Sequence, residues 1–170
     1  MKHIAFLALL CLYLSCGTSG EEAAVREPIR CISRLEVFKS ERLMHVFCED
    51  ERVRTYSIQL GFNPTGHKQK QGDGKTPEGE YVITDLNPNS RFYKSAGISY
   101  PNAADRQWAR EHGYSPGGDI RIHGLPNDYS DDHKILFSHD WTLGCIALCN
   151  ADMEELYQSL TPGTPIAIYP

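Results

Sequence analysis

Short stretches that alternate apolar and polar residues, with turn-forming residues between them, constrain the fold of this chain more than any other feature. Alternation with a period of two is typical of β-strands that bury one face, and Gly, Pro, Asn and Asp are the residues that turns require. The pattern predicts strands at 31–38, 43–48, 52–60, 79–85, 119–123, 145–149 and 164–169. The sequence therefore predicts a mainly β (α+β) fold.

Two segments carry helix-capping signals instead. Asn102 is followed three residues later by Asp105, and Gly113 closes this first segment. Asn150 precedes the second segment, 151–160, which has acidic residues in its first turn. Polar caps and early carboxylates satisfy the free N–H groups and the positive end of a helix. We expect about two helices packed on the strands.

The first twenty residues are typical of a secretory signal peptide, with a basic start (1–3), eleven apolar residues (4–14) and small residues after them. The apolar run is shorter than the ~20 residues that span a bilayer. We therefore expect one exported domain over 21–170, in the periplasm or cell envelope. Two outcomes stay open for Cys16: lipid modification, which would tie the protein to a membrane, or cleavage of the leader and release.

Charge and hydropathy exclude several classes of partner. The formal net charge is −5, and no run of lysine or arginine is present. Nucleic-acid binding depends on neutralising phosphates, so we expect no nucleic-acid partner. No second apolar segment is long enough to span a membrane. We expect a monomer without a cofactor.

Cys31 and Cys48 flank a predicted hairpin. The segment alternates well for two strands around a polar turn at Lys39 and Ser40, and a hairpin folded there places residues 31 and 48 opposite each other. Disulfides form in oxidising compartments, and this one would close a short loop. The sequence predicts a structural disulfide; two separate buried thiols are the alternative, since a shift of one residue would part them.

The stretch 120–150 carries the candidate chemistry. His123 precedes Gly124, and Cys145 follows Gly144 after an intervening loop. A thiol nucleophile needs a base to take its proton and an unhindered backbone beside the sulfur. This pattern predicts a cysteine acyl-transfer enzyme.

A zinc site is the competing interpretation, because five residues of the types that bind zinc lie within this stretch: His123, His133, His139, Cys145 and Cys149. Structural zinc cysteines usually form a tight knuckle, whereas a strand over 145–149 would hold its two sulfurs on one face but ~13 Å apart. We therefore expect no metal, and we expect Cys149 to be a buried packing residue.

Five short motifs occur in a fixed order: Thr76–Tyr81 (TPEGEY), Ser99–Asn102 (SYPN), Ile122–Gly124 (IHG), Thr142–Ile146 (TLGCI) and Gly163–Ile166 (GTPI). In this order they resemble the L,D-transpeptidase catalytic domain family of the YkuD type, cysteine enzymes that act on peptidoglycan stem peptides. The resemblance covers about residue 29 to the C-terminus. It implies a β-sandwich or barrel with the active site at one end.

The resemblance also implies residue roles. Cys145 would attack a peptide carbonyl to give a thioester, His123 would be the base, and the Gly124 carbonyl would orient the histidine. Backbone N–H groups around Gly144 and Cys145 would stabilise the oxyanion. Thr142 would shape the loop that holds the sulfur.

Tyr100, in the second motif, would contact substrate.

Two departures leave the reaction open. Common members of the family have histidine at the place of Leu143 and arginine or asparagine at the place of Ala147. Such features resemble a sub-branch that includes a hydrolase releasing envelope lipoproteins from peptidoglycan. The expected function is L,D-transpeptidation in cell-wall crosslinking. The alternatives are a peptidoglycan hydrolase (L,D-carboxypeptidase or amidase), with a wall-attached lipoprotein as partner, and a non-catalytic peptidoglycan- or zinc-binding module.

Overall fold

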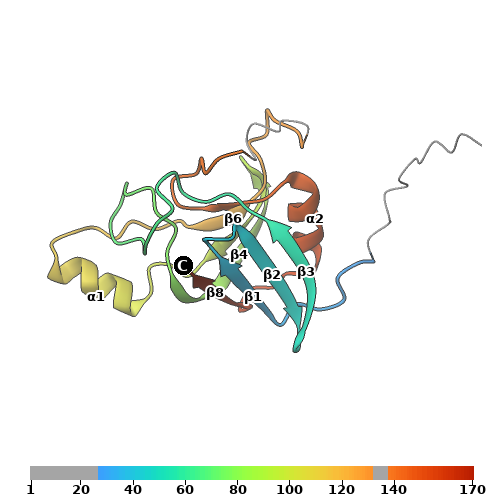
Figure 1. Cartoon of the computed structure of the whole chain (residues 1–170), viewed down its shortest axis with the longest axis horizontal. Helices are drawn as coiled ribbons and strands as arrows, with labels where there is room; N and C mark the ends of the chain where they lie inside the picture. The colour runs from blue at the N-terminus through green and yellow to red at the C-terminus, as the bar shows by residue number, and fades with distance from the viewer. Residues whose placement is uncertain (1–26, 132–137) are drawn as a thin grey trace, which may run out of the picture.

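The computed structural model describes residues 27–131 and 138–170, and its centre is one eight-stranded sheet in the order β3-β2-β1-β8-β4-β5-β6-β7. Figure 1 shows the strands between two helices, α1 and α2. The strands are β1 (Arg34–Phe38), β2 (Leu43–Cys48), β3 (Glu51–Ser57), β4 (Gly79–Ser90), β5 (Tyr93–Ile98), β6 (Arg121–His123), β7 (Ile146–Ala147) and β8 (Pro165–Tyr169). The predicted mainly β fold is confirmed.

The sheet curls until its two ends meet. Just beyond β3, the Gln59 N–H donates to the Ala147 carbonyl of β7 over 3.0 Å, and the Ala147 N–H donates back over 2.8 Å. A second bridge joins Gly61 to Thr142. The resemblance implied a sandwich or barrel, and these bridges give the sheet a barrel-like closure.

The core fills the inside of this curl. Alternate residues of β1, Leu35 and Val37, are fully buried, and so are Ile122 of β6 and its neighbour Ile146 of β7. Burial of such side chains contributes on the order of 2 kcal/mol each. The apolar residues that alternate along the predicted strands are therefore the ones that form the core.

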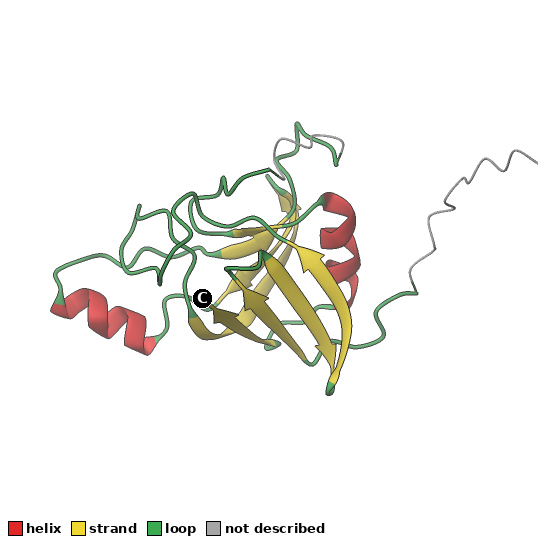
Figure 2. Cartoon of the chain, in the orientation of Figure 1, coloured by secondary structure: helices red, strands yellow, loops and turns green. Residues whose placement is uncertain are grey.

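The helices lie at different sides of the sheet (Figures 1 and 2). Helix α1 (Ala103–Glu111) begins with the predicted capping box, in which Asn102 and Asp105 bond each other's backbone N–H groups. Helix α2 (Asn150–Ser159) packs against β5 and buries Met153 and Leu156. No helix among the described residues is long and apolar enough to cross a membrane.

The cap of α2 differs from the prediction. Cys149 occupies the cap position, and its sulfur accepts from the Asp152 N–H over 3.4 Å. The Asn150 side chain instead accepts from the Leu125 N–H over 2.8 Å. The predicted strand over 145–149 was therefore wrong beyond Ala147, and Cys149 is half-buried at a helix start instead of packed in a strand.

A disulfide joins Cys31 to Cys48, with their Cα atoms 5.3 Å apart. The hairpin register differs from the predicted one, because Leu35 lies opposite Val46. That is two residues from the predicted pairing, and an even shift leaves each side chain on its own face. Cys31 lies before the start of β1, so the hairpin register does not fix its position, and its sulfur can reach Cys48.

Candidate active site

Strands β6 and β7 bring the predicted histidine and cysteine together. The strands run parallel, with Ile122 beside Ile146 and His123 beside Ala147. Because side chains alternate along a strand, His123 lies on the face opposite the buried isoleucines, and the next position of the register places Cys145 on that face, level with Arg121. His123 and Cys145 both line one cleft of about 1220 Å³.

The walls of the cleft come from four parts of the chain: the loop 62–74, the segment 87–95 of β4 and β5, the segment 115–121 and residues 141–145. Buried lysines hold the first wall in place. Lys39 donates to the Gly66 carbonyl (2.8 Å) and the Thr76 carbonyl (3.0 Å), and Lys68 pairs with Asp73 (2.8 Å). The cleft therefore has a fixed wall.

His123 is buried and oriented by a backbone carbonyl. Its Nδ1 lies 2.7 Å from the Gly124 carbonyl oxygen, so this nitrogen is the N–H donor and Nε2 is left as the basic nitrogen. Phe92 packs 4.5 Å from the imidazole between ring centroids, and Trp141 meets it edge-on at 5.6 Å. Burial lowers the pKa of His123 to about 4, although the Gly124 carbonyl opposes the shift. The histidine is neutral at pH 7.

Cys145 carries its proton in this structure. Its thiol donates to the Asp119 carbonyl over 3.7 Å, and burial raises the pKa of the thiol, although an N–H of Arg121 opposes that shift. Asp119 adopts a left-handed backbone conformation (φ 54°), which aspartate tolerates better than most residues. The Cys145 thiol and the His123 imidazole are therefore both neutral in this structure.

The glycine before the cysteine is required by space and by backbone conformation. Gly144 has φ 129°, and a Cβ there would lie 2.5 Å from the Lys75 carbonyl oxygen. Thr142 locks the same turn: its hydroxyl donates to the Cys145 carbonyl over 2.7 Å and accepts from the Gly144 N–H over 3.1 Å. The implied oxyanion role of the Gly144 N–H is thereby corrected, since Thr142 already binds that group.

Gly124 also allows a close approach. A Cβ at this position would lie 2.6 Å from the Asn150 side-chain oxygen and 3.0 Å from the Tyr93 Cβ. Its N–H donates to the Phe92 and Lys94 carbonyls. The histidine's backbone partner is therefore fixed between β5 and the start of α2.

Tyr100 is not placed as the resemblance implied. It is 4% exposed, and its hydroxyl donates to the Pro116 carbonyl over 3.0 Å. Burial raises the pKa of its phenol. Tyr100 thus supports the segment behind the cleft wall and does not reach the cleft surface.

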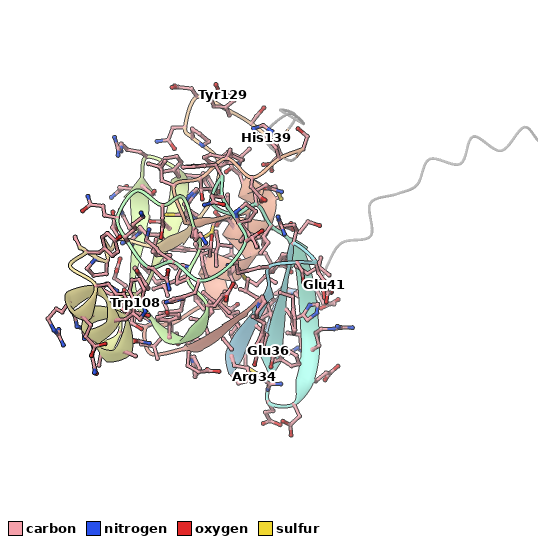
Figure 3. All side chains as sticks on the ribbon, turned by 60° about the vertical axis from the view of Figure 1, so that its left-hand side comes forward. Arg34, Glu36, Glu41, Trp108, Tyr129 and His139 are labelled. Atoms are coloured by element: carbon pink, nitrogen blue, oxygen red, sulfur yellow. A yellow bond between two sulfur atoms is a disulfide. The ribbon has the colours of Figure 1, made fainter. Side chains whose placement is uncertain are left out.

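The described residues contain no cluster of three or more histidine, cysteine or acidic side chains that could hold a metal. His139 is exposed and lies with Tyr129 at one end of the molecule, opposite Arg34 and Glu36 (Figure 3). Cys149 caps α2, and His133 lies outside the described residues. The structure therefore does not assemble the zinc ligands that the sequence suggested, within the part it describes.

Several residues that line the cleft were not predicted from the sequence, among them Arg91, Phe92 and Trp141. Arg91 and Phe92 lie in a segment that was predicted to be a loop, and neither belongs to a motif. Only the pairing of β5 with β6 brings Phe92 to His123. No signal in the sequence could have located them.

Comparison with known proteins agrees with this geometry. The family model described as YkuD, the L,D-transpeptidase catalytic domain, matches residues 32–168. YafK of Escherichia coli strain K12, whose name places it among the L,D-transpeptidases, is 32% identical in an alignment of 149 residues. The match covers 80% of this chain and 53% of YafK. The chain thus spans about half the length of this relative.

Solved structures show the same similarity. The helical cell shape determining protein Pgp2 from Campylobacter jejuni is 27% identical with a TM-score of 0.62, covering 81% of this chain and 47% of Pgp2. An L,D-transpeptidase from Mycobacterium smegmatis shares the fold at 13% identity and a TM-score of 0.53, over 80% of this chain and 58% of its own. The chain belongs to the L,D-transpeptidase catalytic domain family.

Proposed function

We propose that this chain is a cell-wall enzyme that transfers the acyl group of a peptidoglycan stem peptide through a thioester on Cys145. The observation that carries the proposal is the Nδ1 contact of His123 with the Gly124 carbonyl, which leaves Nε2 free as a base in the cleft shared with Cys145. The match to the L,D-transpeptidase family model supplies the substrate class.

In the first step His123 Nε2 takes the thiol proton as the sulfur attacks the peptide carbonyl. A sulfur–carbon bond forms, and the carbon–nitrogen bond breaks when Nε2 passes the proton to the departing amine. The low pKa of His123 and the raised pKa of Cys145 keep the proton on sulfur until attack. The pair therefore acts by general-base catalysis, and not as a preformed thiolate–imidazolium pair.

The developing oxyanion needs a donor beside the sulfur. Thr142 occupies the Gly144 N–H, so we assign this role to the N–H of Cys145 itself. Such donors contribute on the order of 3 kcal/mol to transition-state stabilisation. Thr142 then acts as a positioning residue that fixes the turn.

The second step decides between transfer and hydrolysis. If an amine attacks the thioester, a crosslink forms; if water attacks, the stem is shortened or a wall-bound protein is released. In both cases the sulfur leaves and recovers its proton through His123. Both reactions use the same two residues, so hydrolysis stays open as the alternative. We propose transfer as the main reaction because the matching family model is described as an L,D-transpeptidase domain.

The proposal is tested with purified protein, disaccharide tetrapeptide and mass spectrometry. Dimers that depend on Cys145 support transfer, and shortened stems that depend on Cys145 support the hydrolase. Cys145→Ala should remove either product. If no product depends on Cys145, the proposal of a Cys145 enzyme is contradicted, and a complete absence of product would favour a binding module.

Cys149 provides a matched control within the same chain. Among the residues that the structure describes, it is the other free cysteine besides Cys145, and it caps α2 instead of lining the cleft. Cys149→Ser should therefore keep the products that Cys145→Ala loses. Equal losses in both variants would mean that the assay reports a general effect of thiol removal.

We also propose that the protein is exported to the cell envelope, where a role in cell shape would suit its similarity to Pgp2. The leader-like composition of residues 1–20 supports this, as does the Cys31–Cys48 disulfide, a bond typical of oxidising compartments. Fractionation of cells, with labelled palmitate and a Cys16→Ser variant, tests both export and lipidation. Recovery of the full-length protein in the cytoplasm would contradict the proposal.

A further inference from the structure

Arg91 contributes a positively charged side chain to the lining of the cleft. It lies in the turn between β4 and β5, its side chain is exposed, and it contributes to the cleft wall. The next residue, Phe92, packs on the imidazole of His123 with ring centroids 4.5 Å apart. Arg91 is therefore on the histidine side of the cleft.

Hydrogen bonds hold this turn in one conformation. The Asn127 N–H donates to the Arg91 carbonyl over 3.1 Å, and the Asn127 side-chain oxygen accepts from the Tyr93 N–H over 2.8 Å. The Ser90 hydroxyl accepts from the Phe92 N–H over 3.0 Å. The backbone of Arg91 is thus fixed, and only its side chain is free to adapt.

The other cations of the cleft already have carboxylate partners. Lys68 pairs with Asp73 at 2.8 Å, and Arg121 pairs with Asp85 and Asp119. Within residues 27–131 and 138–170, no hydrogen bond or ion pair engages the Arg91 guanidinium. Arg91 is accordingly the cleft cation that can receive an anion without breaking an existing pair.

The direction of the reaction says which part of the substrate reaches Arg91. His123 must pass a proton to the departing amine, so the leaving group lies over the imidazole and the acyl group lies over the sulfur. Arg91 precedes Phe92, whose ring packs on the imidazole, so the turn that carries Arg91 borders the imidazole side of the cleft. The leaving group is consequently the part of the substrate that faces Arg91.

We infer that Arg91 binds the free carboxylate of the leaving group and so selects substrates whose departing residue carries one. The inference rests on the proposed function and names its specificity. A guanidinium binds a carboxylate through two parallel hydrogen bonds, a geometry that lysine cannot reproduce. Ala147, which stands where other members of the family have arginine or asparagine, has no side-chain donor, so Arg91 supplies the carboxylate donor from the turn between β4 and β5.

Two leaving groups share this chemistry. A C-terminal amino acid joined through its α-amine has a carboxylate close to the scissile bond. A lysine joined through its side-chain amine has a free carboxylate further away. A flexible arginine side chain can serve either, so substrates of both kinds belong in the test.

The experiment compares each substrate with its carboxamide counterpart. Disaccharide tetrapeptide ending in a free acid or an amide forms one arm, and a stem tripeptide joined to the ε-amine of lysine or of lysinamide forms the other. Release of the leaving group gives kcat and KM for wild type, Arg91→Gln and Arg91→Lys. In at least one arm, wild type should prefer the acid about ten- to a hundredfold in kcat/KM.

Arg91→Gln should remove that preference, chiefly through KM, and should leave the amide substrate unchanged. Arg91→Lys should keep part of the preference for the acid, because lysine retains the positive charge. It should not keep all of it, because lysine cannot form the two parallel hydrogen bonds of a guanidinium. Arg110→Gln, which changes an exposed arginine on α1 outside the cleft, should behave like wild type. This control separates a local contact from a general loss of positive charge.

Other results would overturn the inference. The inference fails if wild type converts acid and amide equally well in both arms, or if Arg91→Gln slows both substrates alike. In either case Arg91 does not recognise the carboxylate, and the proposed function still stands. If no leaving group is released in a Cys145-dependent way from any of the four substrates, the proposed function itself fails.

Discussion

The two ends of the sheet are stabilised in different ways. At one end, β1, β2 and β3 form an antiparallel ladder with one register shift, between Val46 and Phe47, and the Cys31–Cys48 disulfide links the start of β1 to the end of β2. At the other end, β6 has three residues and β7 has two, and side chains bonded to backbone hold the chain between and after them. The regular end provides stability, and the irregular end provides the geometry of the site. Substitutions at the regular end should therefore lower stability, and substitutions at the irregular end should lower activity.

The largest expected effect comes from Gly144→Ala at the irregular end. A Cβ would lie 2.5 Å from the Lys75 carbonyl oxygen at φ 129°, so the turn that carries Cys145 must move. A displacement of about 1 Å costs on the order of a hundredfold in rate, and the backbone strain costs ~1–3 kcal/mol. Steady-state kinetics and denaturant unfolding measure the two effects.

Gly163→Ala is the matched control, since Gly163 also has a positive φ of 92° but a Cβ there would meet nothing within 4 Å. It should show the backbone strain without the loss of rate. A Gly144→Ala enzyme as active as Gly163→Ala would show that the close contact does not position the sulfur.

Removal of the disulfide tests the regular end. The paired change Cys31→Ser with Cys48→Ser opens a loop with a sequence separation of 17 and should lower the free energy of unfolding by about 3 kcal/mol. The specific activity of the folded fraction should stay at the wild-type level, because neither Cys31 nor Cys48 lines the cleft. Loss of activity in fully folded protein would contradict this separation.

A smaller effect concerns the pH dependence. The pKa of His123 is about 4 because burial disfavours the charged ring, so kcat/KM should fall as pH decreases through about 4, where the base becomes protonated. Phe92→Ala admits water to the imidazole and should move this acid limb to higher pH. A pH–rate profile measures the shift.

Phe62→Ala is the control for that profile, because Phe62 is exposed on another wall of the same cleft. Its acid limb should coincide with that of wild type. An unchanged limb in Phe92→Ala would mean that the aromatic contact does not set the histidine pKa.

Cys149→Ser should have the smallest effect. Serine is a preferred N-cap residue, and its hydroxyl can replace the sulfur as acceptor for the Asp152 N–H. We expect a change in unfolding free energy within ~0.5 kcal/mol. Full loss of activity with the fold retained would place Cys149 in the reaction after all.

The sequence predicts the regular end better than the irregular one. The alternation of apolar and polar residues in 31–48 predicts both strands and both disulfide partners, because alternate side chains of these strands are buried. Strand β5 (Tyr93–Ile98) was missed, since its lysine, serine, alanine and glycine favour strands weakly and only pairing with β4 and β6 makes it a strand. The extension of β4 to Ser90 was missed for a related reason: its Asn-Pro-Asn sequence is typical of a turn.

The candidate site shows the same division. His123, Gly124, Thr142 and Cys145 were identified from motifs whose spacing along the chain is visible. Other features depend on which segments the fold brings together. They are the hydrogen bond from the Gly144 N–H to Thr142, the burial of Tyr100 and the aromatic contact of Phe92. The motifs therefore identified the candidate site residues, and the structure supplied their surroundings.

The neutral thiol of Cys145 has a consequence for the working life of the molecule. Surroundings that oxidise Cys31 and Cys48 to a disulfide also attack free thiols, and they do so through the thiolate form. Because burial raises the pKa of Cys145, little of this thiol is in the thiolate form. In the mechanism that we propose, the same burial obliges His123 to remove the proton at each attack, and it also slows oxidation of the idle thiol.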